Sequence, residues 1–386
     1  MGTLRGKYAI AGVALSRFGK VPGVSPMGFT LEASKRAVED AGVRMADIDG
    51  LLVVMPAALG EQHGWAARVA AYLGLDPSFC STVDMGGATA CGAVHMAMAA
   101  IEAGYCSTVL CAFGTQTWPQ GVALQLFGSE FHLAYGDVGA ICFSGFLKRR
   151  QQVEYGLPDE LYGRVAVTCR SHAQLNEEAQ MQKPMTLEDY FASRWVAEPL
   201  RLFDCCPNTD GGGAIVVTSV ERARDLRQPV VRVIGVGQEH RAELVEPKGN
   251  GQALWGGMKA AARAYAMAGI RASDLSCVQF YDAFTPRVVN DLVAYGLAAP
   301  EELDAAFARG DFALGGRVPC NTAGGLLSEG HLWGFGHVRE GVRQLRGECG
   351  KRQVAGARIC LVTGYGGAPH ESPPTVSYSA LVLARD

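Results

Sequence analysis

Long apolar runs are missing from this sequence. No run approaches the roughly 20 apolar residues that span a bilayer, so we expect no membrane-spanning helix and no membrane association. The first seven residues, MGTLRGK, are basic, but Arg17 interrupts the segment that follows before a full apolar core develops. This pattern predicts no secretory signal, and we expect a cytoplasmic protein.

An excess of charge of one sign is also absent. The 35 Lys and Arg residues nearly balance the 38 Asp and Glu residues, which gives a net charge of −3 and a pI near 6.3. Basic residues are scattered along the chain, so we expect no nucleic-acid partner. Neither a Walker loop nor a G-x-G-x-x-G motif occurs, so the sequence offers no phosphate-binding loop for a nucleotide.

Cysteines with the spacing of zinc ligands are also missing. The 12 cysteines include the vicinal Cys205-Cys206 and the neighbours Cys106 and Cys111, and neither pair has the spacing of a zinc site. Others, such as Cys360 in RICLVTG, stand in apolar runs, where a free cysteine behaves as a small hydrophobic residue. We therefore expect reduced cysteines and no bound metal.

The segments that are present alternate between strand-like and helical patterns. The chain has 386 residues, 48% apolar and 19% charged, which is enough to bury a sizeable core. Strand-like YAIAGVALS precedes helical FTLEASKRAVEDAGV, and strand-like GLLVVM precedes a helix around WAARVAAYLG. This alternation predicts an α/β fold with a buried, largely parallel sheet.

One part of the chain repeats another. Residues 36–54 and 263–281 are identical at six positions at a constant offset of 227. The strands before them correspond (IAGV at 10–13, VIGV at 233–236), and so do the later strands STVLCAFG and ARICLVTGYGG. The repeat predicts two pseudo-symmetric halves whose glycine-rich turns meet near the axis, in a place where ligands commonly bind.

We predict three segments along the chain. Residues 1–114 form the first half, and residues 226–386 form the second half. Residues 115–225 form an insertion that completes the first half and covers the active site, because insertions on a rigid scaffold often carry specificity. Its aromatic-rich stretch, WPQGVALQLFGSEFHLAYG at 118–136, indicates a bulky substrate of aromatic or steroidal kind.

Four motifs lie around this repeat. They are SRWVAEPLRLFDCCPNTDGGGAIVVTS (193–219), QFYDAFTP (279–286), NTAGGLLSEGHLWGFGH (321–337) and VTGYGG (362–367). In this order and spacing, over essentially the whole chain, they resemble the thiolase superfamily, and they look most like its sterol-carrier-protein-type thiolases and the related steroid side-chain acyl-CoA aldolases. The resemblance implies the thiolase fold, with two pseudo-symmetric α/β halves in αβαβα layers and a large insertion after the first half.

The resemblance also implies a substrate class and partners. Members of the superfamily act on acyl-CoA thioesters, so coenzyme A is expected as substrate moiety or co-substrate, and no cofactor is expected to be bound permanently. They are dimers as a rule, which implies a homodimer. The branch resembled here often pairs with a small zinc-ribbon/OB-fold protein, so a separate companion chain is expected.

Catalytic candidates come from matching the motifs residue by residue. His331 matches the histidine of the family's GH motif, which activates a cysteine nucleophile. Tyr281 stands where related thiolases have His or Asn, and Asp282 follows it as in sterol-carrier-type members. A second family cysteine is not evident, because Tyr365 occupies its glycine-rich turn. Tyr281, His331 and Tyr365 are therefore candidate acid–base residues.

The candidate binding residues are four glycines and two polar residues. They are Gly86, Gly87, Gly366, Gly367, Asp282 and Asn321. The amides of the four glycines are expected to hold the thioester oxygen as it gains negative charge. Asn321 is expected to hydrogen-bond near His331, and a role in forming a turn is the alternative.

The family's nucleophile has no clear equivalent. In VDMGGATACGAVHMAMAAIEAG, residues 83–104, the family's cysteine position falls on Gly87. The nearest thiol, Cys91, comes one turn deeper, about 6 Å along the helix axis. The turn that leads into this helix therefore carries glycine amides, where the family is expected to have a thiolate at the helix N-terminus.

Three functions stay open on the residues alone. Without a thiolate, Tyr281 and His331 would catalyse retro-aldol cleavage of a bulky β-hydroxyacyl-CoA, although the aldolases carry a second Tyr where this chain has His331. With Cys91 as nucleophile and His331 as its base, the enzyme would be a β-oxoacyl-CoA thiolase or acyltransferase. The third is a non-catalytic CoA- or lipid-binding scaffold. We favour the retro-aldol reaction.

Overall fold

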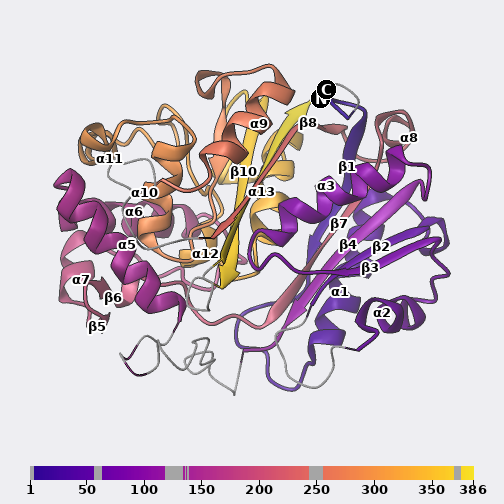
Figure 1. Ribbon diagram of the computed structural model, residues 1–386, viewed down its shortest axis with the longest axis horizontal. Coiled ribbons are helices and arrows are strands. Elements are labelled where there is room, and N and C mark those ends of the chain that lie inside the picture. The colour runs from indigo at the N-terminus through magenta and orange to yellow at the C-terminus, as the bar shows by residue number, and fades with distance from the viewer. Residues whose placement is uncertain are drawn as a thin grey trace.

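One nine-stranded sheet runs through both halves of the described chain. A computed structural model describes residues 4–55, 63–117, 134, 136, 139–242, 255–368 and 375–386 (Figure 1). The strand order is β3-β2-β4-β7-β1-β8-β11-β10-β9. The halves join where β1 and β8 lie side by side, with Tyr8 paired to Val233.

The two halves of the sheet are built alike. The strands of the first half are β1 (Tyr8–Leu15), β2 (Gly50–Val54), β3 (Phe79–Val83), β4 (Thr108–Thr115) and β7 (Gly211–Ser219). Those of the second half are β8 (Val231–Ala242), β9 (Cys277–Gln279), β10 (Ile359–Ala368) and β11 (Thr375–Arg385). β2 lies parallel to β4 as β9 does to β10, and β7 and β11 return antiparallel to β4 and β10.

The prediction of a largely parallel sheet is wrong. Among the described strands, β2 with β3, β2 with β4 and β9 with β10 are parallel pairs. The other five pairings within the nine-stranded sheet are antiparallel. An apolar run indicates a strand that is buried on both faces, but it carries no information about the direction of that strand.

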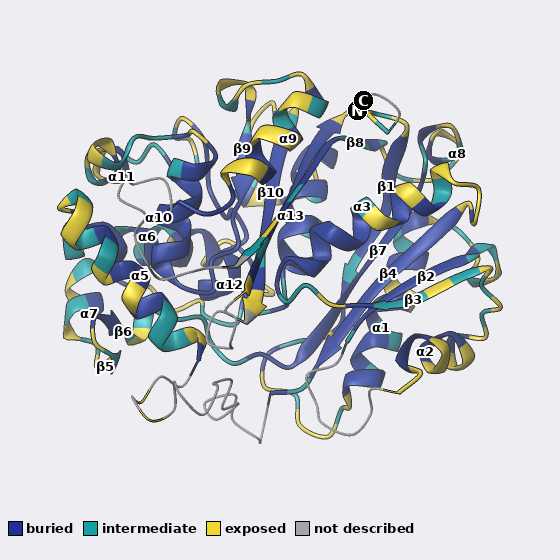
Figure 2. Ribbon diagram, viewed as in Figure 1, coloured by how far each residue is buried: buried dark blue, intermediate teal, exposed yellow. Residues whose placement is uncertain are grey.

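Helices form the other layers. α1 (Pro26–Ala41) and α2 (Trp65–Leu73) pack on the outer face of the first half, and α9 (Met258–Ala268) packs on that of the second. Between the halves lie α3 (Thr89–Glu102) and α13 (Phe335–Arg346), whose apolar residues share one core with strands of both halves. The predicted αβαβα thiolase fold is confirmed, and Figure 2 shows these central elements buried and the outer helix faces exposed.

The remaining elements lie mainly after β4 and around the second half. They are α5 (Ala140–Tyr155), α6 (Asp159–Ala173), α7 (Leu187–Ala192), β5 (Trp195–Ala197), β6 (Leu200–Arg201), α8 (Val220–Arg224), α10 (Thr285–Ala294), α11 (Leu303–Arg309) and α12 (Gly325–Ser328), with short 3-10 turns between several of them. None of the helices in the described ranges is long and apolar enough to cross a membrane. The compartment stays a prediction.

Close packing of helices on strands explains part of the internal repeat. Gly12 in β1 lies under α1, where an added Cβ would be 2.2 Å from the carbonyl oxygen of Ala37. Gly235 in β8 lies under α9 in the same way, with an added Cβ 2.3 Å from the carbonyl oxygen of Ala264. Only glycine lets each helix approach its strand this closely.

Matching turns explain another part of the repeat. After α1, the carboxylate of Asp47 accepts the backbone N–H of Arg44 at 3.0 Å. After α9, the carboxylate of Asp274 accepts the backbone N–H of Arg271 at 2.8 Å. Each aspartate closes a short 3-10 turn that leads into β2 or β9.

The segment predicted as an insertion contains a buried ion pair and is tied to the second half by a hydrogen bond to one member of that pair. Lys148 of α5 is fully buried, and its Nζ lies 3.2 Å from Oδ2 of Asp204. Asp204 also accepts a hydrogen bond from Thr285, at the start of α10. β7 comes from the same segment and fills the first half between β4 and β1. The three segment boundaries stay a prediction, and the aromatic-rich stretch at 118–136 lies almost wholly outside the described residues.

Candidate active site

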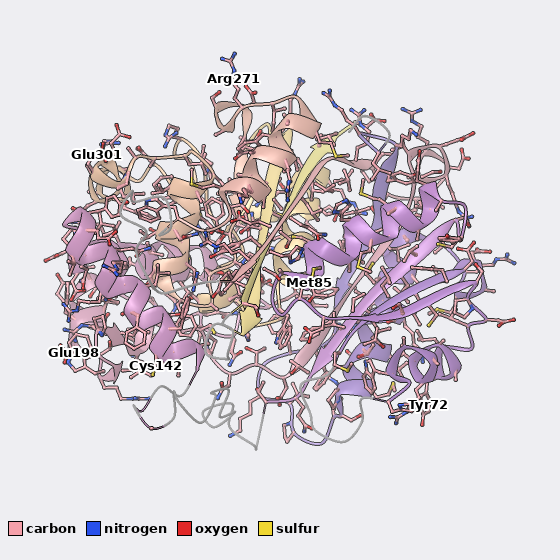
Figure 3. All side chains as sticks on the ribbon, in the orientation of Figure 1. Tyr72, Met85, Cys142, Glu198, Arg271 and Glu301 are labelled. Atoms are coloured by element: carbon pink, nitrogen blue, oxygen red, sulfur yellow. The ribbon has the colours of Figure 1, made fainter. Side chains whose placement is uncertain are left out.

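The glycine turns of the two halves touch each other, as the repeat predicts. An added Cβ on Gly86 would lie 2.9 Å from Cα of Gly366, and one on Gly366 would lie 2.2 Å from the carbonyl oxygen of Met85. Met85, labelled near the centre of Figure 3, therefore lies where β10 approaches the turn before α3. Such a close backbone approach requires glycine on both sides.

The amides of these turns are not all available to a ligand. The N–H of Gly86 donates to Oδ1 of Asp84 at 2.9 Å, which contradicts the predicted oxyanion role of Gly86. The reason is local, because an aspartate side chain readily bonds the backbone two residues further on. Gly366 and Gly367 lie in β10, opposite β11.

Asn321 fixes the backbone that carries Tyr281. Its Oδ1 accepts the N–H of Phe280 at 2.7 Å, and its Nδ2 donates to the carbonyl of Phe280 at 3.0 Å. The N–H of Tyr281 then donates to Oγ1 of Thr363 at 3.0 Å. The prediction that Asn321 hydrogen-bonds near His331 is wrong, because its amide pairs the backbone that continues from β9.

The ring of Tyr281 lies over Gly87. An added Cβ on Gly87 would be 2.0 Å from Cζ and 2.1 Å from the hydroxyl oxygen of Tyr281. Any side chain at position 87, including the cysteine of typical thiolases, would collide with this ring. The phenol therefore occupies the volume that a nucleophile would take, and Tyr281 is itself only 5% exposed.

The hydroxyl of Tyr281 is paired with His331. It lies 3.1 Å from Nε2 of the imidazole. Burial lowers the pKa of His331 from 6.5 to about 4, although the charge of Asp282 opposes this, so the imidazole is neutral at pH 7. Burial also raises the pKa of Tyr281 far above its usual value. A neutral imidazole with Nε2 unprotonated can accept the phenolic proton, and Tyr281 can lose that proton only if a neighbouring group accepts it.

Asp282 is not available to substrate. It is fully buried, and its Oδ1 accepts the N–H of Leu326 at 2.7 Å and lies 2.9 Å from Nε2 of His337. Its Oδ2 lies 3.3 Å from the N–H of Leu327. The prediction that Asp282 binds substrate is wrong, because both carboxylate oxygens hold α12 and α13 in place.

Tyr365 faces the same site from β10. Its ring centroid is 6.4 Å from that of Tyr281. Its hydroxyl accepts a hydrogen bond from Nη2 of Arg287 at 2.8 Å, and the guanidinium also lies 3.7 Å above the tyrosine ring. Arg287, a buried residue of α10, therefore orients this second phenol.

Cys91 lies in the core between the two halves. It is 1% exposed, and its Sγ lies 3.8 Å from the carbonyl oxygen of Val362. Burial raises the pKa of the thiol to about 12. Such a thiol is protonated at pH 7, so its surroundings are those of a small packed residue and not of a nucleophile.

Cys205 and Cys206 belong to the apolar group around Tyr281 and Tyr365. Burial raises the pKa of Cys206 to about 12, and its N–H donates to the carbonyl of Ala283 at 3.0 Å. All twelve cysteines are free. Within the described ranges, no group of three or more His, Cys, Asp or Glu side chains could hold a metal.

Sequence reasoning missed three neighbours of Tyr281 and Tyr365. His337 had a visible signal, because Gly336-His337 is a second Gly-His pair in the motif that contains His331. Arg287 directly follows QFYDAFTP, but nothing in the sequence indicates that it reaches Tyr365. Thr363 stands in a strand, and its partner Tyr281 is 82 residues away. Only the fold brings such residues together.

Comparisons with known proteins agree with this geometry. Residues 239–376 match the Thiolase C-terminal domain-like family. The chain is 35% identical to a steroid side-chain-cleaving aldolase of Thermomonospora curvata, over 96% of this chain and 97% of the relative. It is 34% identical to a 17-hydroxy-3-oxo-4-pregnene-20-carboxyl-CoA lyase of Mycobacterium tuberculosis, over 95% and 98%.

A solved structure is similar over the whole length. The Ltp2-ChsH2(DUF35) aldolase superposes with a TM-score of 0.87 at 34% identity, over 100% of this chain and 99% of that one. The sequence relatives and this structure cover both halves and the segment between them. The chain therefore belongs to the thiolase superfamily, and within it to the family of the steroid side-chain-cleaving aldolases and acyl-CoA lyases.

Proposed function

We propose that the enzyme cleaves a bulky β-hydroxyacyl-CoA by a retro-aldol reaction, without an acyl-enzyme. One observation carries the proposal: the Tyr281 phenol fills the space above Gly87 in which a thiolase holds its nucleophile. The names of the similar proteins, an aldolase and a lyase, support the same reaction. A retro-aldol step needs a base, a site for the enolate and an acid, and it needs no nucleophile.

The proton moves along the Tyr281–His331 pair. The phenol oxygen of Tyr281 takes the proton of the substrate's β-hydroxyl while Nε2 of His331 takes the phenolic proton. The bond between the α- and β-carbons breaks, which leaves a carbonyl product and the enolate of the acyl-CoA. The pair then returns the proton to the α-carbon, or Tyr365 donates its own proton there and is reprotonated as His331 gives up the proton that it took. Shared transfer avoids a free phenolate, which burial makes costly.

The enolate oxygen needs fixed donors. We assign this role to the amides of Gly87, Gly366 and Gly367, since the turns that carry them lie against each other next to Tyr281. Negative charge grows on this oxygen as the carbon–carbon bond breaks, so donors held in place by the fold stabilise the transition state. Coenzyme A is part of the substrate, and no permanently bound cofactor takes part.

The other two functions have less support. Thiolysis would need Cys91 as a thiolate, but this thiol is buried and its pKa is raised to about 12. A non-catalytic scaffold would have no use for a phenol bonded to a neutral imidazole in the family's catalytic position. Neither alternative explains why Tyr281 and Gly87 share one volume.

The partners are proposed from the same family. A homodimer is supported by β3, which forms an edge of the sheet and is only partly buried. A small zinc-ribbon/OB-fold companion is supported by the similar structure, which is a complex with a DUF35 protein. The substrate is proposed to carry a bulky, steroid-like acyl group, and the reaction to belong to lipid degradation.

The test uses two substrates, with and without a companion protein. The enzyme is incubated with a steroid side-chain β-hydroxyacyl-CoA, and separately with the β-oxoacyl-CoA plus free CoA. We expect cleavage of the hydroxy compound only. Tyr281→Phe should lower kcat by about 10²- to 10⁴-fold, because it removes the group that exchanges the proton.

Cys91→Ala is the control variant. It should keep retro-aldol activity, since the thiol lies in the core and takes no part in the proposed step. Full activity of Tyr281→Phe would contradict the tyrosine base. Thiolysis that disappears in Cys91→Ala would establish the thiolase instead.

A further inference from the structure

One buried imidazole beside the site has no part in the proposed reaction. His337, at the start of α13, is 3% exposed, and its Nε2 lies 2.9 Å from Oδ1 of the fully buried Asp282. Because a carboxylate only accepts, Nε2 carries the proton. Nδ1 has no hydrogen-bond partner among the described residues. Asp282 is therefore the group that orients this ring.

Tyr281 lies between two imidazoles. His331 meets its ring edge-on, with the centroids 6.2 Å apart and the planes at 74°. His337 lies along its face, with the centroids 6.3 Å apart and the planes at 26°. Gly87 closes a third side. The position of the phenol is thus determined by contacts with all three residues.

The Asp282–His337 pair also acts on His331 through its charges. Asp282 favours the protonated form of His331, and His337 opposes it. Other titratable groups near the pair are the thiols of Cys169 in α6, Cys206 before β7 and Cys320 before Asn321, and the carboxyl of Glu329 at the end of α12. Burial keeps the three thiols protonated and raises the pKa of Glu329 to about 7. Asp282 and His337 are the two groups whose charges shift the pKa of His331.

We propose that His337 is a positioning residue of the retro-aldol step. Paired with Asp282, it holds the Tyr281 ring over Gly87, and in its protonated form it offsets the carboxylate charge beside His331. The proposal rests on the proposed function, in which His331 accepts the phenolic proton of Tyr281. With the pair intact, His331 is neutral and able to accept. A residue at position 337 that cannot be protonated does not offset the carboxylate of Asp282, which then keeps a proton on His331 up to a higher pH.

His337→Gln separates these effects from simple loss of a hydrogen bond. The glutamine Nε2 can still donate to Asp282, but it carries neither a charge nor a ring. We expect the acidic limb of kcat/KM to move up by about 1 pH unit. We also expect kcat to fall by about 10- to 100-fold, because the phenol is held less firmly.

Asp282→Asn should shift the acidic limb of kcat/KM in the opposite direction to His337→Gln. It removes the charge that favours protonated His331, so the acidic limb moves to lower pH. An NMR titration of ¹⁵N-labelled His331 in the same variants reports both shifts without substrate. A failure of the retro-aldol function would leave this titration intact, so the two proposals fail separately.

His172→Gln is the matched control for lost packing. His172 is 2% exposed, and its ring nitrogens bond only backbone, donating to the carbonyl of Asn321 at 3.2 Å and accepting the N–H of Leu314 at 3.1 Å. It should lower the melting temperature without moving the titration of His331. The proposal is overturned if His337→Gln leaves that titration and the acidic limb unchanged, or if His172→Gln moves them equally.

Discussion

The ring of Tyr281 occupies the space that a side chain at position 87 would need, so the tyrosine requires glycine at that position. The phenol sits where the added Cβ would be, at 2.0 Å from Cζ, so a side chain at position 87 excludes the ring. A thiolate nucleophile and this tyrosine therefore cannot be present together. Which of the two reactions the fold catalyses, thiolysis or retro-aldol cleavage, therefore depends on the residues at positions 87 and 281.

We predict that Gly87→Ala destabilises the protein by about 1–3 kcal/mol, because the added methyl group overpacks the ring of Tyr281. Activity should be largely lost as the phenol moves away from His331. Chemical denaturation of the two single variants and of the double variant with Tyr281→Ala measures the coupling. In the Tyr281→Ala background the cost of Gly87→Ala should nearly vanish, and a cost unchanged there would disprove the collision.

The pH dependence of catalysis should follow His331. Its pKa is lowered to about 4 by burial, so the proton-accepting neutral form persists well below the usual 6.5. We expect kcat/KM to stay constant as the pH falls through 6.5 and to decline only towards about pH 4. The profile is measured over the range where circular dichroism confirms the folded state. A decline centred near pH 6.5 would contradict a pKa of about 4 for His331.

The helices α5 and α10 are joined by the network around Lys148. This fully buried ammonium group lies between Asp204, Tyr190 and the carbonyl of Pro199. Asp204 directly precedes Cys205-Cys206, which lie beside Tyr281. The network thus connects the packing of the inserted segment to one wall of the site.

Asp204→Ala should destabilise the protein by about 3–5 kcal/mol, because it leaves Lys148 charged, buried and short of its main partner. Asp159→Ala is the matched control, since its carboxylate lies 3.0 Å from the same Nζ but is 32% exposed. The control should cost under about 1 kcal/mol. If urea denaturation showed the same loss in free energy of unfolding for both variants, burial would not determine the strength of the Lys148–Asp204 ion pair.

The pseudo-symmetry extends through the whole molecule. Each half repeats the same strand, helix, 3-10 turn and strand, and the glycine turns of both halves meet at the site. Because the site lies between the halves, Tyr281, Thr363 and Asp282 come from the second half, while Gly87 comes from the first. Neither half holds a complete site.

The equivalent glycines of the two halves should respond alike. Gly12→Ala and Gly235→Ala both push a methyl group into a helix carbonyl, at 2.2 and 2.3 Å. Each should cost about 1–3 kcal/mol or more, because the backbone cannot move aside. Gly145→Ala in α5 is the control, where the nearest atom would be 3.6 Å away and helix propensity favours alanine. Thermal melts that show one sensitive glycine and one tolerant one would argue against equivalent packing.

Sequence patterns predicted the repeat and the alternation of strands and helices, because these depend on periodicity, and the resemblance to the thiolase superfamily implied the layers and the candidates Tyr281 and His331. The direction of the strands was predicted wrongly, since burial leaves the same apolar pattern in either direction. The roles expected for Gly86, Asp282 and Asn321 were also wrong. Each of these residues forms hydrogen bonds with groups that the fold brings close to it, and these bonds replace the expected contacts with substrate or His331. Such partners can be as close as Asp84 or, for Asp282, as far along the chain as His337.

The residues alone determined that position 87 carries no side chain and that a tyrosine and a histidine stand in the family's catalytic motifs. Only the tertiary structure decided that the phenol fills the space above Gly87, that Cys91 is buried in the core, and that His337 lies along the face of the tyrosine ring. The physical reason is that excluded volume and desolvation depend on which atoms meet. Gly87 and Tyr281 are nearly 200 residues apart along the chain, and no local sequence pattern shows that they come into contact in the fold.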